Sequence, residues 1–596
     1  MNRRRERRGR IELVMSLFNS PIGGAFRAPQ DDDHHLGPMQ RITGKMRCFR
    51  DDEEVDYLVV GVGSAGGVLC QRLARAGFQV VGMEAGKFWD TERDWVSDEA
   101  GSHGLYWEDP RVIGGSDPLT LGANNCGKGV GGGSVHWAAF TPRFHPSDFE
   151  VYTRDGVGAD WPISYQDLKP YYELLELEMP VAGPAWYPWG DPHGYAYGPH
   201  PMGEVGNTLI RGCTKLGIGV SIGGPVAILS GSRGDRAHCI YRGFCIQACK
   251  VGAKASTLIT HVPDALVNGA EVRDRCMASR IELGKNNRVT GVHYFNHEGK
   301  TRFQRARAVI VSGYAIETPR LLLNSGCVEY PNGLANSSGT VGKYLMAQAG
   351  NVIAGRFDDL IRMYKAPPAH CLTEEFYETD PKRDFARGFA IQTVGPLPIA
   401  FAKQMMAAKG AWGWGLRRTM MDYNHWCALG LLGEILPWED NAVTISATDR
   451  DQFGLPVAHV TFNLHDNDKK LIEFGKNVTM DVMRAAGAKE VVQESRYAHL
   501  VGGARMGKNP ATSVTDAFGR THDIANLFVC DGSLMPTQGS ANPGLTIQAL
   551  AARTADYLIS QGGSVFNSDR RDLTPPPVRR ELSPPGTHGP GVPRLR

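Results

Sequence analysis

The chain has 596 residues, of which 42% are hydrophobic and 21% are charged, and its formal net charge is +2 at neutral pH. This near-neutral balance gives no case for a nucleic-acid partner, and no apolar run approaches the roughly 20 residues that a membrane-spanning helix requires. We therefore expect a protein of two domains with a large buried core and no membrane span.

The two ends of the chain differ in composition from the rest. Residues 1–50 begin with an arginine-rich run, but no apolar stretch of about 7–15 residues follows it, so a secretion signal is not predicted. Residues 562–596 are rich in proline. We expect both segments to be disordered extensions. The expected location is cytoplasmic, with export only alongside a partner that carries a signal.

A dinucleotide-binding unit is predicted directly after the first extension. Residues 57–60 form an apolar strand, a glycine-rich turn then opens a helix, and residues 78–83 form a second strand that ends at Glu84. The glycines permit a tight turn and the close approach of a pyrophosphate, and Glu84 is spaced to bind ribose hydroxyls. The pattern alone does not separate NAD from FAD. The predicted cofactor contacts of the turn are Gly61, Gly63, Ser64, Ala65 and Gly66.

Two further segments of the first half have distinct compositions. Residues 122–137 form a second glycine-rich loop, which suits contact with a large planar or phosphorylated ligand or, alternatively, a flexible surface loop. Residues 161–204 are rich in Pro, Trp, Tyr and Gly and are predicted to be a loop-rich insert.

The pattern changes between residues 346 and 498. Residues 351–357, 442–446 and 457–462 are strand-like, and residues 468–486 have the apolar spacing of an amphipathic helix. Polar and aromatic side chains of this segment are candidates for substrate contact, although core packing and solvated charge are the usual roles of such residues. The candidates are Gln392, Trp412, Trp414, Arg417, Arg418, Tyr423 and Trp426.

Two segments near the C-terminus carry the predicted chemistry. Residues 499–507 begin with His499, and residues 526–546 contain Asn542 followed by Pro543, which suits the first turn of a helix. Oxidation of an alcohol by hydride loss needs a base for the hydroxyl proton and a hydrogen-bond donor for the developing alkoxide. We expect His499 to be the base and Asn542 to be the donor, while the helix start supplies positive potential beside the acceptor.

Together with segments 309–313 and 316–326, these motifs resemble, in kind and in order, those of the glucose-methanol-choline (GMC) family of FAD-dependent oxidoreductases. The histidine–asparagine pair is typical of the branch that contains pyranose oxidases, FAD glucose dehydrogenases and gluconate dehydrogenases. The resemblance implies an α/β fold, in which a Rossmann-like FAD-binding domain is interwoven with an α+β substrate-binding domain built on an antiparallel sheet. It assigns residues 51–345 and 499–561 to the first domain and residues 346–498 to the second.

The resemblance also implies the cofactor, the reaction and the partners. FAD would accept hydride at its N5 atom from a CH–OH group of a sugar, polyol or sugar acid. Electrons would pass to a non-oxygen acceptor such as a quinone or a cytochrome, or to a small subunit. Three alternatives remain, namely an oxidase of the same fold that produces hydrogen peroxide, a long-chain alcohol dehydrogenase, and a flavin-containing lyase. Further cofactor contacts are implied at Gly131, Gly132, Ser134, His136, Asp531, Pro543 and Thr546.

His136 has two interpretations within the family. In several sugar-oxidising relatives a histidine at the Ser-x-His-Trp position is covalently bound to the flavin, and residues 134–137 match that motif. In other relatives the histidine packs beside the ring and FAD is held without a bond.

A cysteine-rich loop also has two interpretations. Cys239, Cys245 and Cys249 are similar in spacing to the ligands of an iron–sulfur cluster in the bacterial FAD glucose dehydrogenases. A loop of buried structural cysteines is the alternative, and zinc lacks an obvious fourth ligand.

Overall fold

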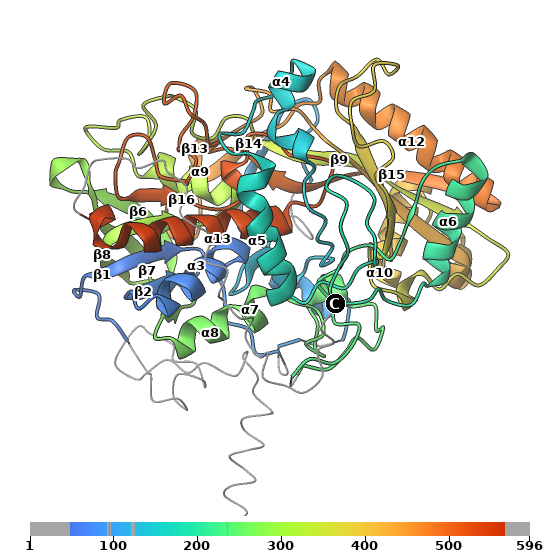
Figure 1. Cartoon of the computed structure of the whole chain (residues 1–596), viewed down its shortest axis with the longest axis horizontal. Coiled ribbons are helices and arrows are strands. Elements are labelled where there is room, and N and C mark those ends of the chain that lie inside the picture. Colours follow the sequence, from blue (N-terminus) through green and yellow to red (C-terminus); the bar gives the residue numbers. More distant parts are fainter. Residues whose placement is uncertain (1–47, 92–93, 96, 121–125, 235, 567–596) are drawn as a thin grey trace, which may run out of the picture.

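The computed structural model describes residues 48–566 apart from residues 92–93, 96, 121–125 and 235. Three β-sheets of seven, six and three strands organise this part of the chain. In Figure 1 the seven-stranded sheet lies on the left with helices packed along it, and the six-stranded sheet lies on the right. The predicted α/β fold, with a Rossmann-like unit and a separate antiparallel sheet, is confirmed.

The seven-stranded sheet has a parallel core around the predicted nucleotide-binding strand. β1 (Val55–Val60) pairs in parallel with β2 (Val80–Met83) on one side and with β8 (Thr301–Val311) on the other. Helices and strands bury β1 on all sides, which explains why the sequence of β1 is almost continuously apolar. The other strands are β5 (Glu271–Arg273), β6 (Met277–Leu283), β7 (Val289–Phe295) and β16 (Leu527–Val529).

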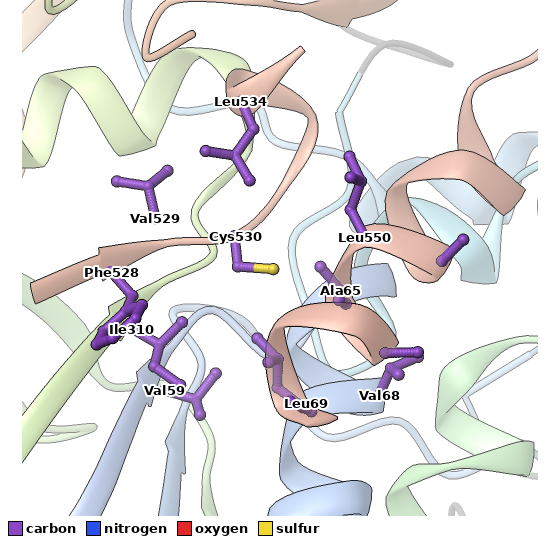
Figure 2. Packing of buried hydrophobic residues seen from close by; sticks show 14 of the residues in the cluster. Val59, Ala65, Val68, Leu69, Ile310, Phe528, Val529, Cys530, Leu534 and Leu550 are labelled. Atoms are coloured by element: carbon purple, nitrogen blue, oxygen red, sulfur yellow. The ribbon is translucent and has the colours of Figure 1, made fainter. Parts of the chain in front are cut away.

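Two helices from opposite ends of the chain pack together against this sheet. Figure 2 shows Leu69 of α3 (Ser64–Arg75) close to Val59 of β1, with Leu550 of α13 (Gly544–Gln561) beside the same helix. Burial of each large aliphatic side chain contributes about 1.5–3 kcal/mol, so this contact fixes the relative position of the two helices. Shorter helices of the same half are α4 (Val151–Asp155), α7 (Thr257–Thr260), α8 (Val262–Val267) and α9 (Tyr314–Asn324).

The six-stranded antiparallel sheet forms the second half of the molecule. Its central strands are β9 (Met346–Arg356) and β12 (Trp426–Gly433), which are almost entirely buried, and β15 (Glu490–Val501) pairs with the outer side of β9. Helix α12 (Asp466–Ala486) confirms the amphipathic helix predicted at 468–486, and it packs on β9 and β12. The remaining elements are β4 (Ser221–Ile222), α6 (Glu204–Leu216), β10 (Cys371–Thr373), β11 (Phe389–Val394), α10 (Pro398–Lys409) and α11 (Gly413–Met421).

A small third sheet joins distant segments of the chain. β13 (Ala442–Arg450) and β14 (Pro456–Thr461) are the strands predicted at 442–446 and 457–462, and β14 pairs in parallel with β3 (Val112–Gly114). These two strands therefore do not extend the antiparallel sheet that begins at β9.

The prediction of a loop across residues 161–204 is wrong for its first half. Helix α5 (Tyr165–Glu178) begins at Ser164, whose Oγ accepts the main-chain N–H of Asp167, while the Asp167 carboxylate accepts the N–H of Ser164. This reciprocal cap satisfies two N–H groups that a helix otherwise leaves unpaired. A Ser-x-x-Asp pattern before an apolar run was the signal for this helix.

The predicted terminal extensions also need correction at their inner ends. Phe49 is fully buried, and its main-chain N–H donates to Glu271 Oε2 over 2.8 Å. Gly562–Phe566 forms a short 3-10 helix, and the Phe566 ring lies 5.2 Å from the ring of Tyr57. Residues 48–50 and 562–566 are therefore part of the folded unit, whereas residues 1–47 and 567–596 lie outside the described residues. No described helix is both long and apolar enough to cross a membrane.

Candidate active site

A cavity of about 1020 Å³ lies where the two large sheets meet, lined by elements of both. It is at the upper end of the range of about 300–1,000 Å³ that small-molecule sites occupy, as a dinucleotide and a substrate together would need. Most of the predicted site residues line it. They are Gly61, Gly63, Ser64, Ala65, Glu84, Gly132, His136, His499, Asp531, Asn542 and Pro543.

The glycine-rich turn after β1 brings the start of α3 to the cavity. Gly61 has a φ of +97°, and a Cβ on Gly66 would lie 1.9 Å from the Gly61 carbonyl oxygen, so neither position accepts a side chain without strain. No side chain in the described part of the chain caps the first N–H groups of α3. These free donors and the helix dipole make the helix start a site for a phosphate group.

Glu84 holds three loops together at the edge of the cavity. Its Oε2 accepts the N–H of Val62 over 3.0 Å, and its Oε1 accepts those of Gly86 and Gly129 over 2.9 and 3.1 Å. Burial raises the pKa of Glu84, and these three donors oppose the rise. Because a carboxylate has about four acceptor positions, one remains for a ribose hydroxyl.

The second glycine-rich loop packs directly on the first. A Cβ on Gly132 would lie 2.8 Å from the Cα of Gly63, so the two main chains can touch only because residue 132 is glycine. Gly131 and Ser134 are placed behind this contact, away from the cavity lining of the described chain. Ser134 Oγ donates to the Gly131 carbonyl over 2.6 Å and accepts the N–H of Thr257 over 3.0 Å. Both residues shape the loop, and their contact with the cofactor stays a prediction. Residues 122–125 lie outside the described residues.

His136 lines the cavity with an unsatisfied ring nitrogen. Its Nε2 is buried and has no hydrogen-bond partner among the described residues, while its ring makes an edge contact with Tyr106 at 4.9 Å. Burial, and after it the positive charge of Lys254, lowers the pKa of His136 to about 3, so the ring is neutral at pH 7. A buried polar atom left without a partner costs free energy, which favours a ligand contact at this position.

The predicted catalytic pair comes together across 43 residues of sequence. His499 lies in β15 at an irregularity in its pairing with β9, and its φ of +54° is rare for a residue with a side chain. The main-chain strain turns the imidazole toward the cavity, where Nε2 lies 3.1 Å from Asn542 Nδ2. Asn542 Oδ1 is buried without a partner among the described residues.

Gln348 fixes the protonation of the histidine ring. Its Nε2 donates to the carbonyls of Gly539 and Ala541 over 2.7 and 2.8 Å, so its Oε1 must be the acceptor that faces His499 Nδ1 at 2.6 Å. The hydrogen of the neutral imidazole is therefore on Nδ1, and the lone pair of Nε2 faces Asn542 and the cavity. No sequence motif pointed to Gln348, because its role arises from the pairing of β9 with β15, in which it lies opposite Ala498.

The electrostatic setting keeps this base unprotonated. Burial, and after it the positive charge of Arg496, lowers the pKa of His499 to about 3. The ring is thus neutral over the whole physiological range and can accept a proton at Nε2. Gln538 Nε2 also donates to the His499 carbonyl over 2.7 Å and holds the strained main chain in place.

The start of α13 forms the wall beside the pair. Pro543, Gly544 and Ile547 line the cavity, and the helix carries no acidic residue in its first turn that would oppose its positive end. Thr546 points elsewhere, because its Oγ1 forms a 2.9 Å hydrogen bond with the hydroxyl of buried Tyr172. The Thr546 hydroxyl therefore has a packing role, and a cofactor contact through the main chain of this residue stays a prediction.

Asp531 lines the cavity, but its carboxylate accepts hydrogen bonds from other residues of the protein. Oδ2 accepts the N–H of Tyr314 over 2.8 Å and the hydroxyl of Thr318 over 2.5 Å, and Oδ1 accepts the N–H of Ser533 over 2.8 Å. The residue joins the end of β16 to the start of α9, so it positions the cavity wall.

The three closely spaced cysteines Cys239, Cys245 and Cys249 line one small cavity. No group of three His, Cys, Asp or Glu side chains that could hold a metal ion occurs in the part of the chain that is described. Burial raises the pKa of the Cys245 thiol to about 12, and Cys239 Sγ accepts the main-chain N–H of Tyr241 over 3.3 Å. The iron–sulfur cluster therefore stays a prediction, and we assign no reaction step to it.

Few of the candidate substrate contacts reach the cavity. Gln392 lines it, whereas the Tyr423 hydroxyl donates to the Pro396 carbonyl over 2.7 Å within the core. Trp412, Trp414, Arg417 and Arg418 lie on an exposed part of the surface instead. Two polar residues that sequence reasoning missed, Glu494 and Arg496, line the cavity on the strand that carries His499.

Known proteins are similar to this chain over most of its length. Residues 55–349 and 437–551 match the two family models described as GMC oxidoreductase. The chain is 34% identical over 540 residues to 2-methyl-1,2-propanediol dehydrogenase of Mycolicibacterium austroafricanum, which covers 85% of this chain and 95% of that protein. It is 27% identical over 546 residues to the fructose dehydrogenase large subunit of Gluconobacter japonicus, with 85% and 98% covered.

Relatives named as oxidases are also similar to the chain. It is 29% identical over 549 residues to 6'''-hydroxyparomomycin C oxidase of Streptomyces lividus, with 88% of this chain and 94% of that protein covered. Among solved structures, formate oxidase from Aspergillus oryzae has a TM-score of 0.62 at 16% identity and covers 87% of this chain and 100% of its own. Pyridoxine 4-oxidase from Mesorbium loti has a TM-score of 0.57 at 18% identity, with 85% and 99% covered. These two structures share the fold.

Proposed function

Because this chain belongs to the GMC oxidoreductase family, we propose that it oxidises a CH–OH group of a sugar, polyol or sugar acid and delivers the electrons to an acceptor other than oxygen. The observation that carries the proposal is the hydrogen-bonded series Gln348–His499–Asn542 at the wall of a cavity large enough for a dinucleotide and a substrate.

The residues of the cavity fit FAD, the cofactor of this family. The free N–H groups at the start of α3 suit a pyrophosphate, and Glu84 suits a ribose. The unsatisfied Nε2 of buried His136 is explained by contact with a bound ligand. When bound, FAD accepts the hydride that leaves the substrate carbon.

The protein supplies the proton chemistry. The substrate hydroxyl lies on the cavity side of His499 and Asn542, where Nε2 accepts its proton and the Asn542 amide donates to its oxygen. The Nδ1–H of the resulting imidazolium stays bonded to Gln348 Oε1, which keeps the ring in place. Because burial disfavours the imidazolium, the proton leaves readily once the product departs.

We infer that His136 contacts FAD without a covalent bond. Acid precipitation of the holoenzyme tests this, because a covalently bound flavin stays yellow in the precipitate. We expect the colour in the supernatant, and colour retained by the washed precipitate would assign a bond to His136 or a neighbour.

The substrate side of the cavity suits a hydroxylated compound. Gln392, Glu494 and Arg496 offer donors and acceptors there, and such groups bind hydroxyls through paired hydrogen bonds. The electron acceptor is a quinone or a haem protein in this proposal, and relatives named as oxidases make direct transfer to oxygen the second candidate.

One experiment tests substrate class and acceptor together. The holoenzyme is mixed anaerobically with sugars, polyols, sugar acids and long-chain alcohols, and loss of the oxidised flavin absorbance is followed. Bleaching by hydroxylated compounds is expected, a response to long-chain alcohols alone would overturn the substrate class, and conversion of substrate without any bleaching would indicate a lyase. In air, peroxide formed as fast as a dye is reduced would indicate an oxidase.

A further inference from the structure

The connection between α10 and α11 exposes large apolar side chains. Trp412 and Trp414 are 81% and 72% exposed, and Ile399, Met406 and Met421 are also exposed. These five residues, which we call the α10–α11 surface, fall within one short stretch of sequence. Contiguous apolar patches on a protein surface usually mark a binding site.

Helix α10 has large apolar side chains on its exposed side as well as on its buried side. Phe401 and Met405 are buried against the protein core, while Ile399 and Met406 face outward. Large apolar side chains left exposed on a helix whose other apolar side chains are already buried favour a further layer over the exposed side. The helix is firmly attached, because the Glu99 carboxylate accepts the N–H groups of Ile399 and Ala400 over 2.6 and 2.7 Å.

The charged residues within the segment that carries these apolar side chains are all basic. Residues 395–421 contain four basic residues and no acidic residue. Lys409 pairs with Glu490, and the Arg417 guanidinium stacks over the Trp414 ring at 4.6 Å. Lys403, Arg417 and Arg418 form no ion pair within the described chain, which leaves three positive charges to attract an anionic partner.

The surface adjoins the opening of the active-site cavity. Ile399, Ala400, Lys403 and Gln404 line the cavity, and Lys403 is also exposed to solvent, so the cavity reaches the outside beside α10. Whatever covers the α10–α11 surface therefore lies against the cavity opening.

We propose that the α10–α11 surface docks this protein onto an anionic lipid bilayer. Projecting tryptophans followed by basic residues, with no acidic residue in the same segment, are the composition of segments that lie in the interface of a membrane. A protein interface would favour a core depleted of charge, whereas here Arg417 stacks on Trp414 at the centre of the surface. Docking would turn the cavity opening toward the bilayer, where apolar compounds dissolve.

Vesicle co-sedimentation of the full-chain holoenzyme tests this. Binding to vesicles of phosphatidylcholine with phosphatidylglycerol is expected, with binding to pure phosphatidylcholine at least tenfold weaker. The double variant Trp412→Ser/Trp414→Ser should lose at least tenfold in partitioning, and Arg417→Ala/Arg418→Ala should remove the dependence on salt. The matched control Trp186→Ser, at a site 64% exposed elsewhere, should bind as the wild type does.

Flavin content and dye-linked activity in solution separate docking from folding, and both should be unchanged in these variants. Equal vesicle binding by the wild type and the double tryptophan variant, or no binding by the wild type, would overturn the proposal. A concentration-dependent dimer that the same tryptophan variant abolishes, without vesicle binding, would likewise overturn it and assign the surface to a second copy of the chain.

Discussion

The two ends of the cavity are built in different ways. At the nucleotide end the predicted contacts are neighbouring main-chain groups of residues 61–66, packed so closely that Gly66 admits no Cβ. At the catalytic end His499, Gln348 and Asn542 come from β15, β9 and the segment before α13. A contiguous motif makes the first end visible in the sequence, whereas the second exists only after the strands have paired.

This difference predicts two kinds of failure. Substitutions at the catalytic end should reduce the rate at which substrate reduces the flavin while FAD stays bound. Substitutions at the nucleotide end should weaken FAD binding and leave the rate per bound flavin unchanged. The variants below test that separation in order of decreasing effect.

The largest effect is expected for His499→Ala. Removing the base should lower the rate of anaerobic flavin reduction by roughly 10²–10⁴-fold, the usual contribution of a positioned acid–base group. The rate should recover in part at high pH, where solvent base removes the hydroxyl proton. Stopped-flow absorbance measures it, with His293→Ala, on β7 outside the cavity, as the control. Undiminished reduction, or loss of FAD from the variant, would contradict the assignment of His499.

Asn542→Ala should have the next largest effect. The amide donates to developing negative charge, and loss of one such donor costs on the order of 10²–10³-fold in rate. High pH should not restore activity, since the base is intact and the missing group is a donor. A pH-rate profile for both variants distinguishes the two roles, and recovery of the Asn542 variant at high pH would refute the one given to it here.

The fold was largely accessible from the sequence, because its strands and helices follow local patterns. The strands around the glycine-rich turn and the long helix α12 were predicted close to their observed bounds. Helix α5 was missed although its Ser164–Asp167 cap is a local signal, because the surrounding Pro and Gly dominated the interpretation of that segment.

The site was only partly accessible, because side-chain direction depends on tertiary packing. Ser134 and Thr546 lie in motifs near the cofactor site, yet each turns away to bond with a residue of another helix. Gln348 lies in no motif, and its role arises because it bonds to His499 across two paired strands. Periodicity predicts which elements form, but not which side chains converge from separate ones.

Gln348 gives an intermediate effect and a test by pH. Gln348→Met removes a hydrogen bond to the imidazolium, which is worth about 1.5–3 kcal/mol, so reduction should slow by roughly 10–100-fold. Since the active form of His499 is the unprotonated one and its pKa is about 3, the wild-type rate should not fall as pH drops from 8 to about 5. Gln348→Glu should raise that pKa and bring an acidic limb into this range. A profile identical to that of the wild type would show that Gln348 does not act through the histidine.

The smallest effect is expected at the nucleotide end, for Glu84→Gln. The substitution keeps the shape of the side chain but replaces one of its two oxygens by an NH₂ group. In Glu84 the two oxygens accept the N–H groups of Val62, Gly86 and Gly129, so the NH₂ group faces at least one of these donors. Loss of one net hydrogen bond is worth about 0.5–1.5 kcal/mol, so FAD should bind roughly two- to tenfold more weakly. Titration of the apoprotein with FAD measures this, and the rate of reduction per bound flavin should equal that of the wild type. A slower rate with unchanged affinity would mean that the two ends of the cavity are coupled. The nucleotide end would then not act on FAD binding alone.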